Sequence, residues 1–599
     1  MSEDKTKQTT VNISEKANVI WEVATHLSGL YKPHEYGKVI LPMTVIKRFN
    51  DTLLSTHEKV LAMNKQCDER GIQVKDGFLQ KAAGHKFYNT SVFTLDKLLD
   101  DADNIEDNFR SYLNGFSDNV QDILENFEFD KEITKMSKGN ALYIVIQEFC
   151  SEKAYMGADK VSSVDMGYVF EELVRKFSES YDEQAGAHFT ARDIIYLMTD
   201  LLIAGDKESL KQEVVTKTVY DMTMGTSQML GCLTERIQQI NPDADVTCFG
   251  QEFNPETFAI AKADMLIKDG NADNMKFGDT LVKQEFAPEN VKGDQFENYE
   301  FDYIISNPPF GIDWKKEKDS VEAENRLGDA GRFGAGLPPI SDGQMLFMLN
   351  GVKKLKDNGR MAIIQNGSPL FSGDAGSGQS DIRGLLLEND WLEAIVQMPT
   401  DMFYNTGIST YIWLVTKEKS PERVGKVQLI DASNMFEARR KCLGNKRRDF
   451  SQECIEKIVM AYNEFENKFY DYGEKSIESK IFDNEDFKYT KVVVETPLKD
   501  EKGNIILDKK GRKQPNTELR DSEIIPFKQD IEEYIQKNVY PFNPDAYIDE
   551  SKTKIGYEIP FTRQFYKYIP PKASDEIFAE IKQLEAEETK LMKELFGNE

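Results

Sequence analysis

Apolar residues recur at helical spacing through roughly the first quarter of the chain. Residues 18–30 and 37–54 place apolar side chains three to four positions apart, and glycine and proline are sparse there. This spacing puts the apolar side chains on one face of a helix. We therefore predict a helical N-terminal domain over residues 1–160.

Beyond that domain the pattern changes to short apolar runs that alternate with helical stretches. The runs are residues 218–222, 246–252, 275–280, 301–306, 360–366, 392–399 and 409–417. Near-continuous apolar strands joined by helices are typical of a parallel sheet covered on both faces. We predict an α/β fold with a doubly wound, Rossmann-like sheet in a domain over residues 161–480. We expect its last strand to be antiparallel, because only a short loop separates it from the strand before.

The remaining residues, 481–599, are more polar and form a third predicted region. Residues 492–514 predict hairpin-like strands that turn at Gly503 and Gly511. A final helix from Ser574 to about Phe596 forms a helical tail. It carries apolar residues at nearly heptad spacing, namely Ile577, Ile581, Leu584, Leu591 and Leu595. Either this helix packs on its own chain or it docks onto a partner.

Composition narrows the class of protein. The 599 residues carry a net charge of −28, so the chain binds phosphate backbones poorly without a local basic surface or a basic partner. No apolar run approaches the roughly 20 residues of a membrane span, and the N-terminus lacks the apolar core of a signal peptide. The six cysteines are scattered and histidines number five. We expect a cytoplasmic protein without a membrane contact, a disulfide framework or a metal site.

Polar residues follow the first three strands of the predicted sheet. In such a sheet, ligands bind beyond the carboxyl ends of the strands. Asp221 ends the first strand, Gly225 permits a tight turn, and Thr226 can cap the helix that follows. Glu252 ends the second strand, where a carboxylate can accept both hydroxyls of a ribose. Asp279 ends the third, where it can accept from the exocyclic amine of adenine. Together these positions predict a nucleoside cofactor.

NAD and S-adenosylmethionine both fit such a site. Residues 223–228 read TMGTSQ and lack the G-x-G-x-x-G pattern of dinucleotide-binding turns. The sequence therefore favours a cofactor with an amino-acid tail over one with a pyrophosphate.

The fourth strand ends in Asn307-Pro308-Pro309-Phe310. The prolines remove two backbone donors and forbid a helical continuation. The Asn307 side-chain oxygen and the Pro308 carbonyl can then accept the two N–H bonds of an exocyclic amine, which makes its nitrogen more nucleophilic. Phe310 offers a stacking face for a planar base. If S-adenosylmethionine methylates this amine, its sulfonium loses the methyl group and leaves as a neutral thioether. Positioning of the reactants then supplies most of the rate enhancement, and no metal is required.

At this point the chain resembles the amino-group (N6-adenine) DNA methyltransferases, and among them the modification subunits of type I restriction–modification systems. The resemblance extends over nearly the whole chain and is carried by residues 20–49, 167–195, 376–419 and 544–568, together with the cofactor and NPPF segments. It implies S-adenosylmethionine as cofactor and makes the 161–480 domain the catalytic one. NPPF by itself would also admit glutamine or RNA methyltransferases.

The resemblance also implies cofactor contacts outside the strand ends. These come from the segment AHFTAR, which consists of Ala187, His188, Phe189, Thr190, Ala191 and Arg192. At the first turn it implies roles for Ser227 and Gln228 beside Asp221, Gly225 and Thr226. The chain departs from the commonest family pattern at Ala191, Met222, Ser227 and Gln228, which bears on the geometry around the methionine tail.

The resemblance further implies partners. A separate specificity subunit would choose the DNA sequence, a second modification subunit would complete a clamp, and a restriction (translocase/nuclease) subunit would join them. The target adenine must be flipped out of the duplex. A basic run supplies candidate DNA contacts, which are Arg439, Arg440, Lys446, Arg447 and Arg448. Such a run can equally be a solvated basic face, and an inactive scaffold is the alternative to an enzyme.

Overall fold

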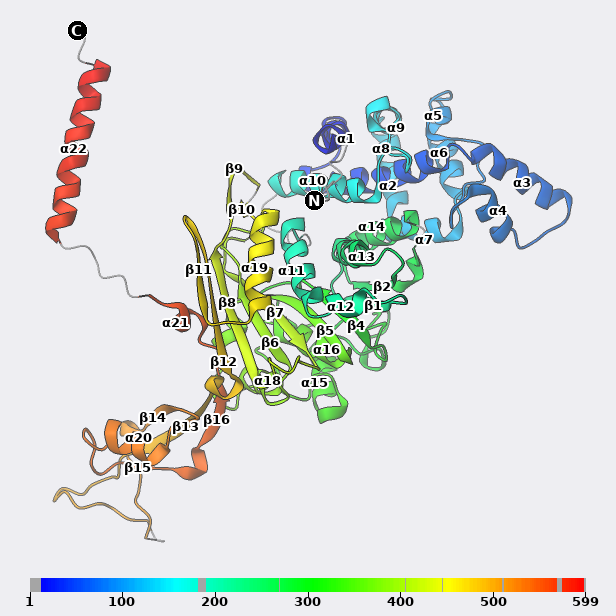
Figure 1. Ribbon diagram of the computed structural model, residues 1–599. Helices are drawn as coiled ribbons and strands as arrows, with labels where there is room; N and C mark the ends of the chain where they lie inside the picture. Colours follow the sequence, from blue (N-terminus) through cyan, green and yellow to red (C-terminus); the bar gives the residue numbers. More distant parts are fainter. Residues whose placement is uncertain are drawn as a thin grey trace. The chain divides into compact units, whose positions relative to one another are not determined.

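A computed structural model describes residues 12–180, 190–268, 270–404, 406–443, 445–508, 511–567 and 574–596 (Figure 1). The chain divides into two compact units, Met1–Ile559 and Pro560–Glu599. Among the described residues, no helix has both the length and the apolar character needed to cross a membrane.

The N-terminal part of the first unit is helical, as predicted. Its helices are α1 (Ile13–Leu27), α2 (Gly37–Leu53), α3 (His57–Glu69), α4 (Asp76–Ala83), α5 (Leu95–Leu98), α6 (Ile105–Asn114), α7 (Asp118–Asn126), α8 (Phe129–Lys138) and α9 (Leu142–Phe149). Phe49, Phe87 and Phe109 are fully buried between them. The helix α10 (Ser163–Ser180) leads from this part toward the sheet.

The main sheet has ten strands within the described residues, in the order β11-β12-β8-β6-β7-β5-β4-β1-β2-β3. Their bounds are β1 (Thr216–Asp221), β2 (Asp245–Glu252), β3 (Met275–Phe277), β4 (Phe301–Ser306), β5 (Leu355–Asn366), β6 (Leu392–Gln397), β7 (Thr410–Thr416), β8 (Lys426–Asn434), β11 (Lys468–Tyr472) and β12 (Lys475–Asp483). Strands β1 to β5 pair in parallel, and β7 is antiparallel to both β5 and β6. The predicted doubly wound sheet and its antiparallel strand are confirmed.

Strands β8, β11 and β12 extend this sheet and were not predicted. β8 pairs in parallel with β6, and β12 pairs antiparallel with β8 and β11. Buried and partly exposed positions are mixed along β12, so its segment reads as polar. The predicted boundary at residue 480 stays a prediction; β12 ends at Asp483.

Helices cover the sheet on two faces. The chain moves from β1 to β2 to β3 in one direction and from β4 to β5 in the other, so right-handed crossovers place the connecting helices on opposite faces. One face carries α11 (Arg192–Ala204), α13 (Gln228–Ile240), α14 (Pro255–Ile267) and α19 (Gln452–Glu464), and the other carries α16 (Gln344–Lys353) and α18 (Gly378–Glu388). The strand order reverses between β1 and β4.

Smaller elements follow the main sheet. A hairpin of β9 (Glu437–Leu443) and β10 (Lys446–Asp449) connects β8 to α19. A second sheet contains β13 (Lys488–Glu495), β14 (Asp521–Pro526), β15 (Tyr547–Ile548) and β16 (Lys554–Tyr557), with α20 (Ile531–Asn538) beside it. Between β13 and β14 the chain turns at Gly503 and Gly511, whose φ angles of +84° and +78° suit glycine. The two predicted turns are confirmed.

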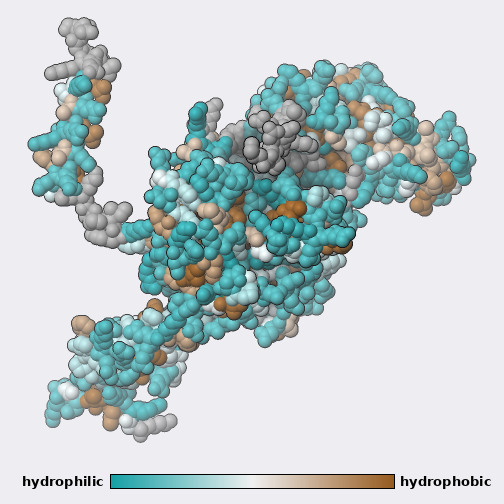
Figure 2. Space-filling view, viewed as in Figure 1, coloured by the Kyte–Doolittle hydropathy of each residue, from teal (hydrophilic) through white to brown (hydrophobic). Residues whose placement is uncertain are grey.

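The second unit contains α21 (Phe561–Phe565) and α22 (Ser574–Phe596). Apolar side chains along α22 are exposed, namely Ile577, Phe578, Ile581, Leu584, Leu591 and Met592. Figure 2 shows hydrophobic residues along this helix, whereas hydrophilic residues predominate on the drawn face of the first unit.

Candidate functional site

A cavity of about 620 Å³ lies at the carboxyl ends of β1, β2, β3 and β4. Its lining includes the strand-end residues Asp221, Glu252, Asp279 and Asn307, which come from four separate segments. The cavity sits where the strand order reverses, which is where doubly wound sheets bind their ligands. The predicted strand-end residues therefore converge on one site.

Glu252 fastens the first turn of this cavity. Its Oε2 accepts from the backbone N–H of Gly225 at 2.8 Å, and its Oε1 accepts from those of Phe253 and Asn254 at 2.9 and 2.7 Å. Gly225 has a φ of +51°, which suits glycine. The carboxylate that was predicted to receive a ribose thus also shapes the turn after β1.

Asp221 and Asp279 are carboxyls with perturbed acidity. Burial raises the pKa of Asp221 to about 7, although its Oδ1 accepts from Ser306 Oγ at 2.7 Å and from the Thr223 N–H at 3.0 Å. Burial, assisted by the nearby Glu317 carboxyl, raises the pKa of Asp279 to about 6. A cation bound beside either group would favour its charged form.

The charge of the lining discriminates between the two cofactors considered from the sequence. The lining holds the carboxyl side chains of Asp221, Glu252, Asp279, Asp313 and Glu317, together with Lys316. An excess of carboxylates suits the sulfonium and ammonium groups of S-adenosylmethionine and repels a pyrophosphate. The residues present therefore fit S-adenosylmethionine.

Asn307 is held by a residue of the AHFTAR segment. Its Nδ2 donates to Thr190 Oγ1 at 2.8 Å, whereas its buried Oδ1 has no hydrogen-bond partner in the described part of the chain. Phe310 packs edge to face against Phe403, with ring centroids 6.1 Å apart. Pro308 is buried and Pro309 lines the cavity. The amide therefore presents an acceptor at the end of β4.

The other predicted cofactor residues lie in different places. Thr190, Gly225, Thr226 and Gln228 line the cavity. Ala191, Arg192 and Ser227 are buried and do not belong to the described lining. Ala187, His188 and Phe189 fall outside the described residues.

The predicted cap of the first helix is wrong. Ser227, and not Thr226, occupies the N-cap position of α13, and its side chain accepts no capping hydrogen bond. Ser227 has a φ of +64°, so the turn includes it and α13 begins at Gln228, one residue later than a cap at Thr226 would give.

Sequence reasoning missed the apolar walls of the cavity. They include Phe253, Leu281, Trp314 and Phe347. Phe253 follows Glu252 directly and is 55% exposed, so an aromatic after a strand-end acid was a usable signal. Trp314 and Phe347 had no such signal, because they reach the cavity from the segment after NPPF and from α16.

The predicted basic run forms the β9–β10 hairpin. Since β8 runs parallel to β6 and β6 runs in the same direction as β4, the hairpin leaves the sheet at the edge that carries Asn307. Arg440 and Arg447 are exposed.

Three further basic residues of the hairpin have partners within the described part of the chain. Arg439 pairs with Asp449 at 2.6 Å. Arg448 donates to Thr400 Oγ1 at 2.9 Å and lies over the ring of Phe436. Lys446 is 1% exposed, and its Nζ lies 3.0 Å from Asp193 Oδ2 and 3.1 Å from the Met402 carbonyl. Lys446 thus anchors the hairpin to α11.

Two family models match the chain. The model described as N-6 DNA Methylase matches residues 162–502, and the model described as HsdM N-terminal domain matches residues 16–149. The first match alone spans more than half of the chain, including every strand of the main sheet.

Individual relatives agree with these models. The type I restriction enzyme MjaIX methylase subunit of Methanocaldococcus jannaschii is 22% identical over 75% of this chain and 77% of its own length. The MpnII methylase subunit of Mycoplasma pneumoniae is 28% identical over 50% of this chain and 52% of its own length. A crystal structure of a type I restriction–modification methyltransferase subunit from Streptococcus thermophilus has the same fold. Its TM-score is 0.61 at 22% identity, over 79% of this chain and 97% of that one.

Proposed function

The chain belongs to the N-6 DNA methylase family, and from that membership we propose how its residues perform methyl transfer to DNA. When bound, S-adenosylmethionine would supply an electrophilic methyl group; the products are N6-methyladenine, S-adenosylhomocysteine and a proton that the amine releases to solvent. We assign its binding to lining residues of the cavity, which are Thr190, Asp221, Gly225, Thr226, Gln228, Glu252 and Asp279. Phe253 would stack on the cofactor's adenine. Contacts from Ala187, His188, Phe189, Ala191, Arg192 and Ser227 remain predictions from the family resemblance.

The target amine belongs to a flipped-out adenine. Asn307 Oδ1 and the Pro308 carbonyl accept its two N–H bonds, which favours a nucleophilic nitrogen, and Phe310 stacks on the base. The observation that carries this assignment is that the two polar atoms of the Asn307 amide are used differently. Its Nδ2 is committed to Thr190 and its buried Oδ1 is without a partner in the described residues. A buried acceptor of this kind costs free energy until a ligand satisfies it.

We propose that this chain acts in a larger assembly. A net charge of −28 disfavours independent binding to DNA, so a separate specificity subunit would choose the sequence. A second copy of this chain and a restriction subunit would complete the complex; the similarity to methylase subunits of type I restriction enzymes supports the restriction subunit. The exposed apolar side of α22 would dock the specificity subunit. Arg440 and Arg447 would contact DNA phosphates. We propose a cytoplasmic location for the assembly, because it needs access to chromosomal DNA.

The substitution Asn307→Ala tests the mechanism. We expect the rate of labelled-methyl transfer to cognate DNA, with the specificity subunit present, to fall by roughly 10²- to 10³-fold or more. S-adenosylhomocysteine should bind within about twofold of wild type, because the amide faces the target base. Asn18→Ala, on the exposed surface of α1, is the matched control and should leave both values unchanged.

Two results would contradict the proposal at different levels. Normal turnover by Asn307→Ala would remove the assigned mechanism while leaving the function. Transfer by the wild-type chain to RNA or protein, and not to DNA, would replace the function itself.

A further inference from the structure

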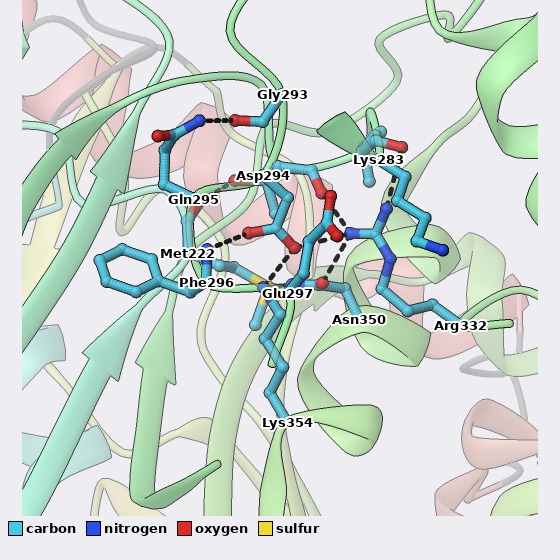
Figure 3. Close-up of polar contacts among 12 residues, drawn as sticks. Met222, Lys283, Gly293, Asp294, Gln295, Phe296, Glu297, Arg332, Asn350 and Lys354 are labelled. Atoms are coloured by element: carbon cyan, nitrogen blue, oxygen red, sulfur yellow. Dashed lines mark hydrogen bonds and ion pairs between the residues drawn. The ribbon is translucent and has the colours of Figure 1, made fainter. Parts of the chain in front are cut away.

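A buried charge cluster contacts the segment that follows Asp279, and Figure 3 shows Asp294, Arg332 and Lys354 of this cluster. It consists of Asp294, Glu324, Arg332 and Lys354, which are 2%, 3%, 8% and 1% exposed, respectively. Arg332 and Lys354 balance the two carboxylates, as burial requires. The proposed transfer reaction uses none of these side chains.

Arg332 is the centre of this cluster. Its Nε and Nη2 donate to the two carboxylate oxygens of Glu324 at 2.8 and 2.7 Å, and its Nη1 lies 3.0 Å from Asp294 Oδ2. Lys354 pairs with the same Asp294 oxygen. In Figure 3 the Asp294 carboxylate lies between the two cationic side chains.

The same guanidinium also holds the main chain that follows Asp279. Arg332 Nη1 donates to the Thr280 carbonyl at 2.6 Å, and Nη2 lies 3.5 Å from the Leu281 carbonyl. Asp279 itself accepts from the Leu281 N–H at 2.9 Å. The position of the Asp279 carboxylate therefore depends on a peptide segment that Arg332 fixes.

Two further walls of the cavity are connected to this segment. Arg332 Nη1 donates to Asn350 Oδ1 at 3.0 Å, and Asn350 Nδ2 lies 3.5 Å from the Met222 sulfur. Thr280 Oγ1 donates to the Met222 carbonyl at 2.7 Å. One guanidinium thus joins the ends of β1 and β3 to α16.

We propose that Arg332 is a positioning residue of the cofactor site, which holds Asp279 where its carboxylate accepts from the exocyclic amine of the cofactor's adenine. This inference rests on the proposed function, because it takes that adenine as the ligand of Asp279. Arginine suits the role because its planar group donates in several fixed directions at once, whereas a lysine is a single point charge.

The test compares two ligands that differ at one position of the base. S-adenosylhomocysteine has an amine there, and its deaminated analogue, S-inosylhomocysteine, has a carbonyl that Asp279 cannot accept from. Titration calorimetry on the full chain gives the ratio of their dissociation constants. We expect a ratio of roughly 10–100 for wild type, the range for a hydrogen bond to a charged group. The ratio should approach ~1 in Asp279→Ala, which removes the acceptor, and in Arg332→Lys, which leaves the acceptor without its fixed position.

Arg360→Lys is the matched control. Arg360 is buried, pairs with Glu393 at 2.7 Å and donates to the Leu202 carbonyl, and neither of these partners belongs to the cavity lining, whereas the Thr280 and Leu281 that Arg332 contacts do. The control should lose stability yet keep the wild-type ratio, which separates positioning from general destabilisation. If Arg332→Lys does not fold, Glu324→Gln loosens the same clamp and should lower the ratio.

Each outcome decides a different point. A wild-type ratio in Arg332→Lys, or an equal fall in Arg360→Lys, overturns the positioning role and leaves the proposed function intact. A ratio near one in wild type removes the role of Asp279 and this inference with it. Failure of wild type to methylate DNA overturns the proposed function and is measured separately.

Discussion

Ser227 has a strained backbone conformation in the turn that follows β1. It adopts a φ of +64°, a conformation that costs a side-chain-bearing residue about 1–2 kcal/mol. Its buried hydroxyl has no hydrogen-bond partner in the described residues, so no bond offsets that cost. In this turn the Gly225 N–H nevertheless donates to Glu252 Oε2 at 2.8 Å. The Ser227 backbone is therefore strained, but the hydrogen bond that holds the turn is kept.

Asp221 predicts how cofactor binding depends on pH. Its pKa of about 7 means that the neutral form persists in the free protein well above the usual range of an aspartate. The cationic cofactor prefers the ionised form, so affinity should rise with pH and level off above about pH 7, and it should be lost as pH falls below that value. Calorimetry of S-adenosylmethionine binding between about pH 5.5 and 8 measures this slope.

Asp221→Asn is the control for this prediction. It keeps the shape of the side chain and removes the titration, so the slope near neutrality should flatten. Some slope below about pH 6 should remain, because burial also raises the pKa of Asp279 to about 6. An unchanged profile in Asp221→Asn would assign the pH dependence to another group.

The β9–β10 hairpin combines two kinds of basic residue in one element. Lys446 is a buried anchor, whereas Arg447 is exposed one position later. Phe450 extends the anchor, because its N–H donates to Asp193 Oδ2 at 2.8 Å. Asp193 belongs to α11, which begins just after the Thr190 that holds Asn307. The hairpin is thus fixed to the helix that follows the Thr190 segment of the candidate site.

We predict opposite effects from neighbouring substitutions in this hairpin. Lys446→Met leaves Asp193 without its ion-pair partner and should lower the free energy of unfolding by about 3–5 kcal/mol in a denaturant titration. Arg447→Ala should change stability by less than about 0.5 kcal/mol, because the side chain is exposed. It should weaken DNA binding by the assembled complex and reduce the salt dependence by about one phosphate contact. If Arg447→Ala leaves the DNA affinity unchanged, the exposed basic residues of the hairpin form a solvated face and do not contact DNA.

At the scale of the whole molecule, the second unit differs from the first in how its apolar residues are placed. In the first unit they fill continuous cores, whereas those of α22 are between 44% and 64% exposed. Burying such a surface requires a partner. We therefore predict that Leu584→Asp abolishes co-purification with the specificity subunit. The melting temperature of the isolated chain should stay unchanged, because the site is exposed.

Ala586→Asp provides the matched charge on α22 outside the predicted apolar stripe. It should leave assembly intact. Equal loss of assembly in both variants would mean that added charge on the helix, rather than its apolar side, disrupts the complex.

The sequence by itself determined the helical N-terminal part and the first seven strands of the doubly wound sheet. It also determined which polar residue ends each of the first four strands. Hydrophobic periodicity is a local property, and β4 matches its predicted bounds of 301–306. Because parallel strands end at a common edge, Asp221, Glu252, Asp279 and Asn307 could be brought together without coordinates.

Only the tertiary structure decided which charges are buried and which strands extend the sheet. Nothing near Arg332 in the sequence reveals that Asp294 and the Thr280 carbonyl receive its hydrogen bonds, and Lys446 looks like any other residue of a basic run. Strands β11 and β12 lie at one side of the sheet with mixed burial, which leaves little local signal. The physical reason is common to all three cases. The burial of a charge or a polar strand depends on neighbours that are distant in the chain, and a local pattern carries no information about them.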